Sequence, residues 1–336
     1  MPPDFSHVVV IGASAGGVTA LLEISSQLNA MFPAPICIVQ HVGNNPSLLP
    51  ELLRFRGANH ARHAEDGERL ASGTLHVAPP DHHMLLEGDR LRLTQGPKEN
   101  HARPAIDPLF RTAALAWGPR VIGVILTGQM DDGAAGLRAV RECGGVTIVQ
   151  DPDSAAEPEM PRNALAAVPV DHCVPLAQIA PLLQRLVGSR TPPSAPPAPE
   201  EVVREVAINR GEQSMDNLDA IGTRVPLTCP DCGGTLWEMN SPKPLRYRCH
   251  TGHAYSVVSL RRAQQQASED ALRHSVRALR ERELLLRRVA AIAAATGDRA
   301  QAEAGLAAAD RLHAQVETVT AMAQTTAPDA GEESDA

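Results

Sequence analysis

Short apolar runs alternate with longer amphipathic segments through the first half of this chain. The apolar runs are rich in β-branched residues and too short to be buried helices, a pattern typical of strands covered on both faces. These runs lie at residues 7–12, 36–40, 121–126 and 145–149. The segments between most of them repeat apolar residues at helical spacing, at 17–29, 46–57, 106–117 and 133–143. Such alternation predicts an α/β fold: a doubly wound, mostly parallel sheet with helices on both sides.

Residues 74–94 depart from this alternation. Three short apolar runs follow one another there without a helix between them, at 74–78, 83–87 and 90–94. The last two flank Glu87-Gly88-Asp89. Closely spaced strands around a glycine turn predict a β-hairpin inserted into the α/β pattern.

A proline-rich stretch, Thr191–Pro199, ends the α/β pattern. Its composition predicts a stiff, solvated linker that neither packs nor forms a helix. We therefore expect five parts: an α/β domain at 1–190, a proline-rich linker and connecting segment at 191–225, a small cysteine module at 226–257, a helical hairpin at 258–327 and a disordered tail at 328–336.

The last long segment has apolar residues at spacings of three and four on both sides of Gly297. This pattern predicts an antiparallel helix pair at 258–294 and 299–324. The apolar stripes favour packing within the chain, and a dimeric coiled coil is the alternative.

Composition restricts the classes of function. The chain of 336 residues has a net charge of -8 and is only 2% aromatic, which argues against general nucleic-acid binding and base stacking. No apolar run approaches the length of a membrane span, and Met1–Asp4 lacks the basic start of a signal peptide. We expect a cytoplasmic protein with no membrane insertion, in which Cys37, Cys143 and Cys173 are small core residues.

The first turn after a predicted strand carries the most specific chemistry. Gly12-Ala13-Ser14-Ala15-Gly16 follows the apolar run that ends at Ile11. Gly-x-Ser-x-Gly between a strand and a helix is the nucleophile-elbow pattern, in which glycines allow a sharp turn that exposes a serine hydroxyl. A glycine turn of this kind also opens nucleotide-binding βα units, so the serine needs partners before it indicates catalysis.

Candidate partners follow two other predicted strands. A serine hydroxyl becomes a good nucleophile when a base takes its proton and a carboxylate orients that base. His41 directly follows residues 36–40, and Asp131 and Asp132 follow residues 121–126. Because the carboxyl ends of parallel strands meet at one edge of a sheet, these groups can converge. The chain order Ser, His, Asp differs from the order in α/β-hydrolases, so that fold is not assigned.

The residues around these positions form a recognisable set. Residues 7–188 resemble the catalytic domain of the CheB-type protein-glutamate methylesterases of chemotaxis. The matching blocks are Ile11–Gly17, Gln40-His41, Ala64–Glu68, Val77–Pro79, Arg103–Phe110, Leu126–Gly128, Asp132–Gly136 and Met160–Arg162. They occur in the family's order and span more than half of the chain.

The resemblance implies a function and a set of roles. Ser14 would be the nucleophile, His41 the general base and Asp132 the carboxylate that orients it, with no cofactor needed for catalysis. The reaction would be hydrolysis of glutamate γ-methyl esters to glutamate and methanol, and deamidation of receptor glutamines is also known in the family. Partners would be methylated helices of a chemoreceptor or a sensor kinase, within the pathway of the cognate receptor methyltransferase. The alternative from another class is a non-catalytic signalling adaptor that binds partners through its C-terminal modules.

The chain departs from the family in three places. The family's Thr-Gly-Met-Gly-x-Asp-Gly is here Thr127-Gly-Gln-Met-Asp-Asp-Gly133, so Gln129 replaces the methionine associated with the oxyanion. Asp131 is a second carboxylate beside Asp132, which we favour because it directly precedes Gly133 as in the family. The first predicted strand begins near residue 7, so we expect no phospho-receiver domain before it in this sequence. The hypothesis is a constitutively open site, or control by the C-terminal module or a partner.

The loop before the helix at 106–117 has two interpretations. His101 and Arg103 are candidates for electrostatic contact with an acidic receptor helix. The alternative is a rigid loop in which Asp107 or Pro108 only starts the helix.

Cysteine spacing predicts a zinc ribbon at 226–257. Cys229-x2-Cys232 and Cys249-x3-His253 supply four ligands for a closed, structural zinc ion. His253 is favoured over His250 because Thr251-Gly252 lets the chain turn back. The alternative to a zinc site is a redox Cys-x-x-Cys. A ribbon with nearby arginines can also bind nucleic acid, but the acidic chain favours a role in protein docking.

Overall fold

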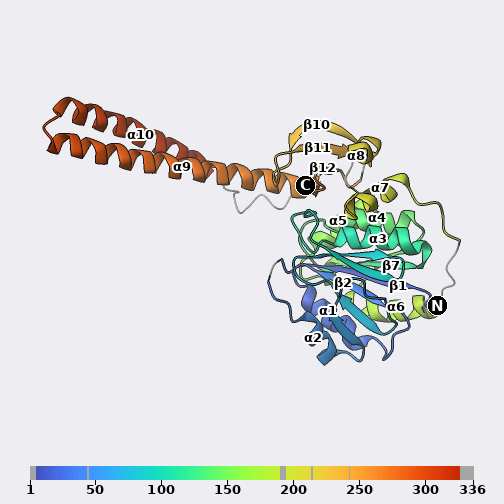
Figure 1. Cartoon of the computed structure of the whole chain (residues 1–336). Coiled ribbons are helices and arrows are strands. Elements are labelled where there is room, and N and C mark those ends of the chain that lie inside the picture. The colour runs from blue at the N-terminus through green and yellow to red at the C-terminus, as the bar shows by residue number, and fades with distance from the viewer. Residues whose placement is uncertain (1–4, 44, 190–193, 213–214, 242, 326–336) are drawn as a thin grey trace. The chain divides into compact units, whose positions relative to one another are not determined.

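The computed structural model describes residues 5–43, 45–189, 194–212, 215–241 and 243–325 (Figure 1). These residues fall into two compact units, Met1–Leu260 and Arg261–Ala336. The predicted disordered tail, 328–336, lies outside the described residues. Within the described residues, no helix combines the length and the apolarity that a membrane span requires.

A seven-stranded parallel sheet forms the centre of the first unit. Its strand order is β3-β4-β2-β1-β7-β8-β9. The strands are β1 (Val8–Ala13), β2 (Ile36–Gln40), β3 (His60–His63), β4 (Thr74–Val77), β7 (Val121–Ile125), β8 (Val146–Gln150) and β9 (His172–Val174). The four predicted apolar runs form β1, β2, β7 and β8, and β1 is buried along its whole length. The predicted α/β class is therefore confirmed.

Helices cover both faces of this sheet. The helices are α1 (Gly17–Gln27), α2 (Leu49–Arg56), α3 (Ile106–Trp117), α4 (Ala134–Glu142), α5 (Glu159–Ala167) and α6 (Leu176–Ser189). One hydrophobic cluster contains the apolar residues of α1, α2 and α6, and a second contains those of α3, α4 and α5. The helices after β1 and β7 thus lie on opposite faces, which places a topological switch point between these neighbouring strands.

The predicted hairpin is present as β5 (His83–Glu87) and β6 (Arg90–Thr94), paired antiparallel. It packs on α3, where the Leu86 N–H donates to Thr112 Oγ1 at 3.0 Å. The apolar run at 74–78, which precedes the hairpin, forms the parallel strand β4 of the central sheet. The sequence pattern predicts neither edge strand, because β3 is short and mostly polar and β9 has only three residues. Cys173 is exposed on β9, contrary to its predicted place in the core.

Residues 194–197 of the proline-rich stretch are exposed, and the described part of the stretch is non-helical, as expected of a solvated linker. Pro196 lies against Gly144, where an added Cβ would be 3.1 Å from the proline Cδ. Helices α7 (Glu200–Asn209) and α8 (Met215–Ile221) follow directly. Val202 and Val206 of α7 are buried in the same cluster as α3. One apolar face of α7, with a surface contact from Pro196, therefore connects the residues after the linker to the α/β core.

The cysteine module is a four-stranded antiparallel sheet with the order β10-β11-β12-β13. Its strands are β10 (Gly222–Thr228), β11 (Thr235–Met239), β12 (Arg246–Cys249) and β13 (Ala254–Ser256). The module belongs to the same compact unit as the α/β core. The two are therefore packed together rather than joined as separate bodies.

The predicted helical hairpin is present as α9 (Val257–Ala295) and α10 (Arg299–Thr325). Gly297 has a φ of 89°, a left-handed conformation that suits a glycine in the turn. Arg287 pairs with Asp310 at 2.9 Å, and Gly305 lies close to Ala290, so the two helices run antiparallel (Figure 1). The buried residues Ala290, Leu312 and Val316 lie between the helices.

Candidate active site

A sharp turn between β1 and α1 carries Ser14. β1 ends at Ala13 and α1 begins at Gly17, preceded by Gly16 with a φ of 76°. Gly128 of the neighbouring β7 loop lies directly against the serine, since an added Cβ there would be 2.7 Å from Ser14 Cβ. The two glycines allow the two loops to approach each other closely.

His41 follows β2 at the same edge of the sheet. Its backbone N–H donates to the carbonyl of Ala13 at 3.1 Å, which ties the two loops together. Its ring Nδ1 lies 3.1 Å from Ser14 Oγ. Gln40 stabilises the backbone of the Ser14 turn, because its Nε2 donates to the Ser14 carbonyl at 2.8 Å. The His41 side chain remains 20% exposed, so the site is open to solvent.

Asp132 lies on the other side of the imidazole. Its Oδ2 is 2.8 Å from His41 Nε2 and also accepts the Ile106 N–H at 2.7 Å. Its Oδ1 accepts Asn100 Nδ2 at 3.1 Å and the Asp107 N–H at 3.3 Å. Burial alone would raise the pKa of Asp132, but the hydrogen bonds from His41 and the Ile106 N–H outweigh it and lower the pKa. The carboxylate is therefore held ionised.

This arrangement selects one tautomer of His41. An ionised Asp132 requires the proton on Nε2, which leaves the Nδ1 lone pair facing the Ser14 hydroxyl. An imidazole in that state can accept the serine proton. Asp132 can then stabilise the imidazolium that forms.

Asp107 and Asp132 cap each other's helices. The Asp132 carboxylate accepts N–H groups from the first turn of α3. In return Asp107, at the start of α3, accepts the N–H groups of Gly133 and Gly136 at 3.1 and 2.6 Å, at the start of α4. Burial and the nearby charge of Asp132 raise the pKa of Asp107 to about 7. The interpretation of Asp107 as a helix start was incomplete, because its side chain also holds the loop of Asp132.

Asp131 points to a different partner. Its Oδ1 accepts Ser256 Oγ of β13 at 2.7 Å, whereas Asp132 contacts His41. Burial raises the pKa of Asp131 to about 6. Of the two adjacent carboxylates, Asp132 is thus the one beside the imidazole, and Asp131 faces the cysteine module.

The loop before α3 is anchored within the unit. Arg103 pairs with Asp81 at 2.7 Å, and His101 Nε2 lies 2.9 Å from the carbonyl of Ser259. Arg103 Nη1 also donates to the Gly96 carbonyl at 2.8 Å. These contacts support the interpretation of a rigid loop over that of a free, receptor-facing basic patch.

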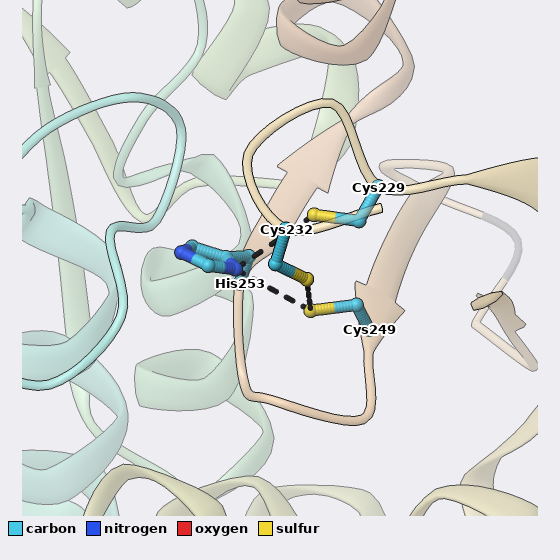
Figure 2. Close-up of side chains that lie close together, drawn as sticks. All are labelled: Cys229, Cys232, Cys249 and His253. Atoms are coloured by element: carbon cyan, nitrogen blue, oxygen red, sulfur yellow. Dashed lines mark hydrogen bonds between the residues drawn. The ribbon is translucent and has the colours of Figure 1, made fainter. Parts of the chain in front are cut away.

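The four predicted metal ligands converge. Figure 2 shows Cys229, Cys232, Cys249 and His253 directed toward a common centre, and their ligand atoms all lie within 4.8 Å of one another. Cys232 Sγ is 3.7 Å from Cys249 Sγ, and His253 Nδ1 is 3.5 Å from Cys249 Sγ. Zinc–sulfur bonds of about 2.3 Å in a tetrahedron separate sulfurs by about 3.8 Å, so the donor set fits zinc. His250 is exposed and outside this group.

Several polar residues at the site carry no sequence signal. Asn100, Ser256 and Ser259 are ordinary loop or strand residues in the sequence, and Gln40 stands out only as the neighbour of His41. Their roles depend on contacts between segments that are far apart in the chain. The hydrogen bond from Ser259 Oγ to Asn100 Oδ1, at 2.9 Å, is one such contact.

Comparisons with known proteins show similarity over the first half of the chain. A putative protein-glutamate methylesterase/protein-glutamine glutaminase of Leptospira interrogans is 41% identical over 186 residues, which are 54% of this chain and 94% of the relative. The protein-glutamate methylesterase FrzG of Myxococcus xanthus is 38% identical over 188 residues, and the chain spans only 56% of its length. The crystal structure of the Thermotoga maritima CheB methylesterase catalytic domain matches 54% of this chain and 99% of that domain, with a TM-score of 0.52 and 33% identity.

The family model described as CheB methylesterase matches residues 9–183, the α/β core up to α6. This stretch contains Ser14, His41 and Asp132, and it ends before the cysteine module. By this match, the chain belongs to the CheB methylesterase family.

Proposed function

We propose that this chain is a protein-glutamate methylesterase that removes methyl groups from glutamate side chains of a signalling receptor and releases methanol. The observation that carries the proposal is the relay from Ser14 Oγ to His41 Nδ1 at 3.1 Å and from His41 Nε2 to Asp132 Oδ2 at 2.8 Å. It lies within a chain segment of the methylesterase family. The same acyl chemistry extends to the side-chain amide of glutamine, the second activity in the name of the Leptospira relative.

The proposed reaction uses the three side chains in turn. Ser14 Oγ attacks the ester carbonyl while His41 Nδ1 accepts its proton, and Asp132 stabilises the imidazolium. Backbone N–H groups near Ser14 would stabilise the developing oxyanion. His41 then protonates the methoxy group, which departs as methanol. The glutamyl group remains bound to Ser14 as an ester. A water molecule activated by His41 hydrolyses that ester and regenerates the serine.

We propose that a structural zinc ion is bound by Cys229, Cys232, Cys249 and His253, without a part in the reaction. Four protein ligands close the coordination sphere, so no position is left for a substrate. The module has few apolar residues, so metal binding would contribute much of its folding free energy. Metal analysis of the purified chain tests this, and a protein that folds with no zinc would refute it.

The substrate we propose is a methylated helix of a chemoreceptor or sensor kinase in the cytoplasm. The cognate methyltransferase adds the groups that this chain would remove. We further propose the domain organisation of catalytic domain at 1–190, connecting segment at 191–225, zinc ribbon at 226–257 and helical hairpin at 258–327. We expect no nucleic-acid partner, because the chain is acidic.

Methanol release from a receptor fragment bearing radiolabelled methyl esters tests the function. The wild-type chain is compared with Ser14→Ala and with the matched control Ser26→Ala, whose serine is exposed on α1. We expect Ser14→Ala to lose at least about a thousandfold in rate, since removal of a triad member leaves little activity in related chemistry. The control should equal the wild type. Equal release from the wild type and Ser14→Ala would refute the esterase and favour the adaptor.

A further inference from the structure

One amide joins the two buried carboxylates beside the imidazole. Asn100 Nδ2 donates to Asp132 Oδ1 at 3.1 Å and to Asp107 Oδ2 at 3.2 Å. Both donors of the amide are therefore used on acidic oxygens. A donor shared in this way favours the ionised form of Asp132 and fixes the direction in which its other oxygen faces His41.

The other end of the same amide is held by the cysteine module. Asn100 Oδ1 accepts the Ser256 N–H of β13 and the Ser259 Oγ of α9, both at 2.9 Å. The backbone N–H of Asn100 also donates to the Ala254 carbonyl at 2.8 Å. All four hydrogen-bonding positions of the amide are filled, so a flip would set its NH₂ group against the Ser256 N–H.

The backbone around Asn100 is held in an uncommon conformation. Asn100 and His101 have φ values of 48° and 62°, a left-handed region that residues other than glycine seldom adopt. Such conformations persist only where the surroundings hold them. Glu99 provides that hold through buried ion pairs with Arg111 of α3 and Arg248 of β12. The loop is thus clamped between the α/β core and the module.

We propose that Asn100 is a positioning residue of the esterase and that β13 and the first turn of α9 hold it in place. Asn100 acts through Asp132 and does not touch the substrate. The part of the chain beyond the family match then completes the active site, because it supplies the contacts that orient this amide. Asp131, which accepts Ser256 Oγ at 2.7 Å, is a second contact between the catalytic loop and the same strand. The inference rests on the proposed function.

The test uses the full chain with three variants. Asn100→Asp keeps the shape and the acceptors toward Ser256 and Ser259, but it sets a carboxylate against Asp132. Asn100→Gly removes the amide and tolerates the positive φ. Ser259→Ala removes the hydroxyl that donates to Asn100 Oδ1, and with it the hydrogen bonds between that hydroxyl and Ser256. Ser275→Ala is the control, because that exposed serine on α9 bonds only its own helix, at the Ala271 carbonyl.

Each variant is measured for kcat and KM on methylated receptor and for the rate at which a fluorophosphonate labels Ser14. We expect kcat to fall about 10- to 100-fold for Asn100→Asp and about 3- to 10-fold for Ser259→Ala, since a charge-assisted hydrogen bond is lost or weakened. KM should stay within about twofold, because the substrate contacts are unchanged. Labelling rates should fall in parallel with kcat, and Ser275→Ala should match the wild type.

A kcat within twofold of the wild type for Asn100→Asp and Ser259→Ala would overturn the inference. So would a rise in KM at unchanged kcat. If Asn100→Asp does not fold, the kcat and labelling rates of Ser259→Ala and Asn100→Gly test the inference by the same criteria. If the wild-type chain releases no more methanol than Ser14→Ala, the proposed function fails, and the labelling rates still decide whether Asn100 activates Ser14.

Discussion

Replacing Glu99 by glutamine removes a buried charge that joins the α/β core to the cysteine module. Glu99 is 1% exposed. Its Oε1 accepts hydrogen bonds from Arg248 Nη2 at 2.5 Å and from Asn209 Nδ2 at 2.6 Å. Its other oxygen receives Arg111 Nη2. Glutamine keeps the shape but presents an NH₂ group to one of these donors. Glu205, which pairs with Arg246 and Arg248, is then left to balance the buried guanidinium groups.

The size of the effect follows from the pKa of Glu99. Burial alone would raise it, but the charges of Arg111 and Arg248 prevail and lower the pKa from 4.5 to about 2. A shift of this size corresponds to roughly 3 kcal/mol of stability at neutral pH. Removing one partner of a buried ion pair costs about 3–5 kcal/mol in other proteins, which agrees. We therefore expect Glu99→Gln to lower the free energy of unfolding by about 3 kcal/mol and Tm by about 6–12 °C.

The two tryptophans of the chain allow the unfolding of each part to be followed. Trp117 lies in α3 of the core and Trp237 in β11 of the module, and both are buried. In Trp117→Phe and Trp237→Phe backgrounds, fluorescence reports on one part at a time. Glu99→Gln should shift the denaturation midpoint of both reporters, because the carboxylate connects both parts.

The control is Glu51→Gln, whose partner Arg54 is 3.4 Å away at an exposed site. Exposed pairs contribute little, so its free energy of unfolding should change by no more than about 0.5 kcal/mol. A change of less than about 1 kcal/mol for Glu99→Gln would refute the reasoning. A shift seen by Trp237 but not by Trp117 would also refute it, since the module would then unfold independently.

The same ion pair predicts an acid dependence. The pKa of Glu99 is lower in the folded state than in the unfolded state, so its contribution is complete above about pH 4.5 and is lost as the pH falls toward 2. The stability difference between the wild type and Glu99→Gln should therefore shrink over that range. Denaturant titrations at several pH values measure this, and a difference that stays constant down to about pH 2 would contradict the assignment.

Three further changes test other parts of the structure. Asp132→Asn should lower kcat roughly a thousand- to ten-thousand-fold in the methanol assay, because an amide facing His41 favours the tautomer whose proton points at Ser14; a loss of less than tenfold would contradict the relay. Cys249→Ser should reduce bound zinc, measured by mass spectrometry, and lower Tm by several degrees, whereas unchanged zinc would exclude this residue as a ligand. Met130→Gly should raise stability by about 0.5–1 kcal/mol in denaturant unfolding, because Met130 has a φ of 65°; a loss of stability would show that this conformation is not strained.

The sheet and the neighbourhood of the candidate site could be predicted because they depend on local patterns. Apolar runs predict the four central strands. The rule that strand ends meet at one edge predicts that Ser14 and His41 lie beside Asp131 or Asp132, and the family resemblance favours Asp132. The structure places Ser14, His41 and Asp132 within hydrogen-bonding distance, and their catalytic roles remain a proposal. The same patterns failed for the edge strand β3, His60–His63, because an edge strand needs few apolar residues.

Contacts between distant segments could not be predicted. Nothing in the composition of the proline-rich stretch indicates that Pro196 would lie on Gly144, or that α7 would join the core. Asn100 likewise looks like an ordinary turn residue, and its partners Ser256 and Ser259 follow more than 150 positions later. Such pairings depend on how the folded parts meet, which periodicity and spacing do not encode.

The loop Thr127–Gly133, which carries Asp132, has an uncommon backbone conformation and is held by distant segments. The family's glycine at its fourth position is here Met130, which adopts the left-handed conformation that glycine would accept without strain. Asn163 Nδ2 donates to the Met130 carbonyl at 2.8 Å, and Ser256 Oγ donates to Asp131 at 2.7 Å, so the loop is held from two sides. One of those sides is the cysteine module, which lies beyond the family match. A loop that carries Asp132 and has a left-handed residue at Met130 is therefore held partly by a segment that the family model does not include, which is the physical basis for the proposal that this segment completes the candidate site.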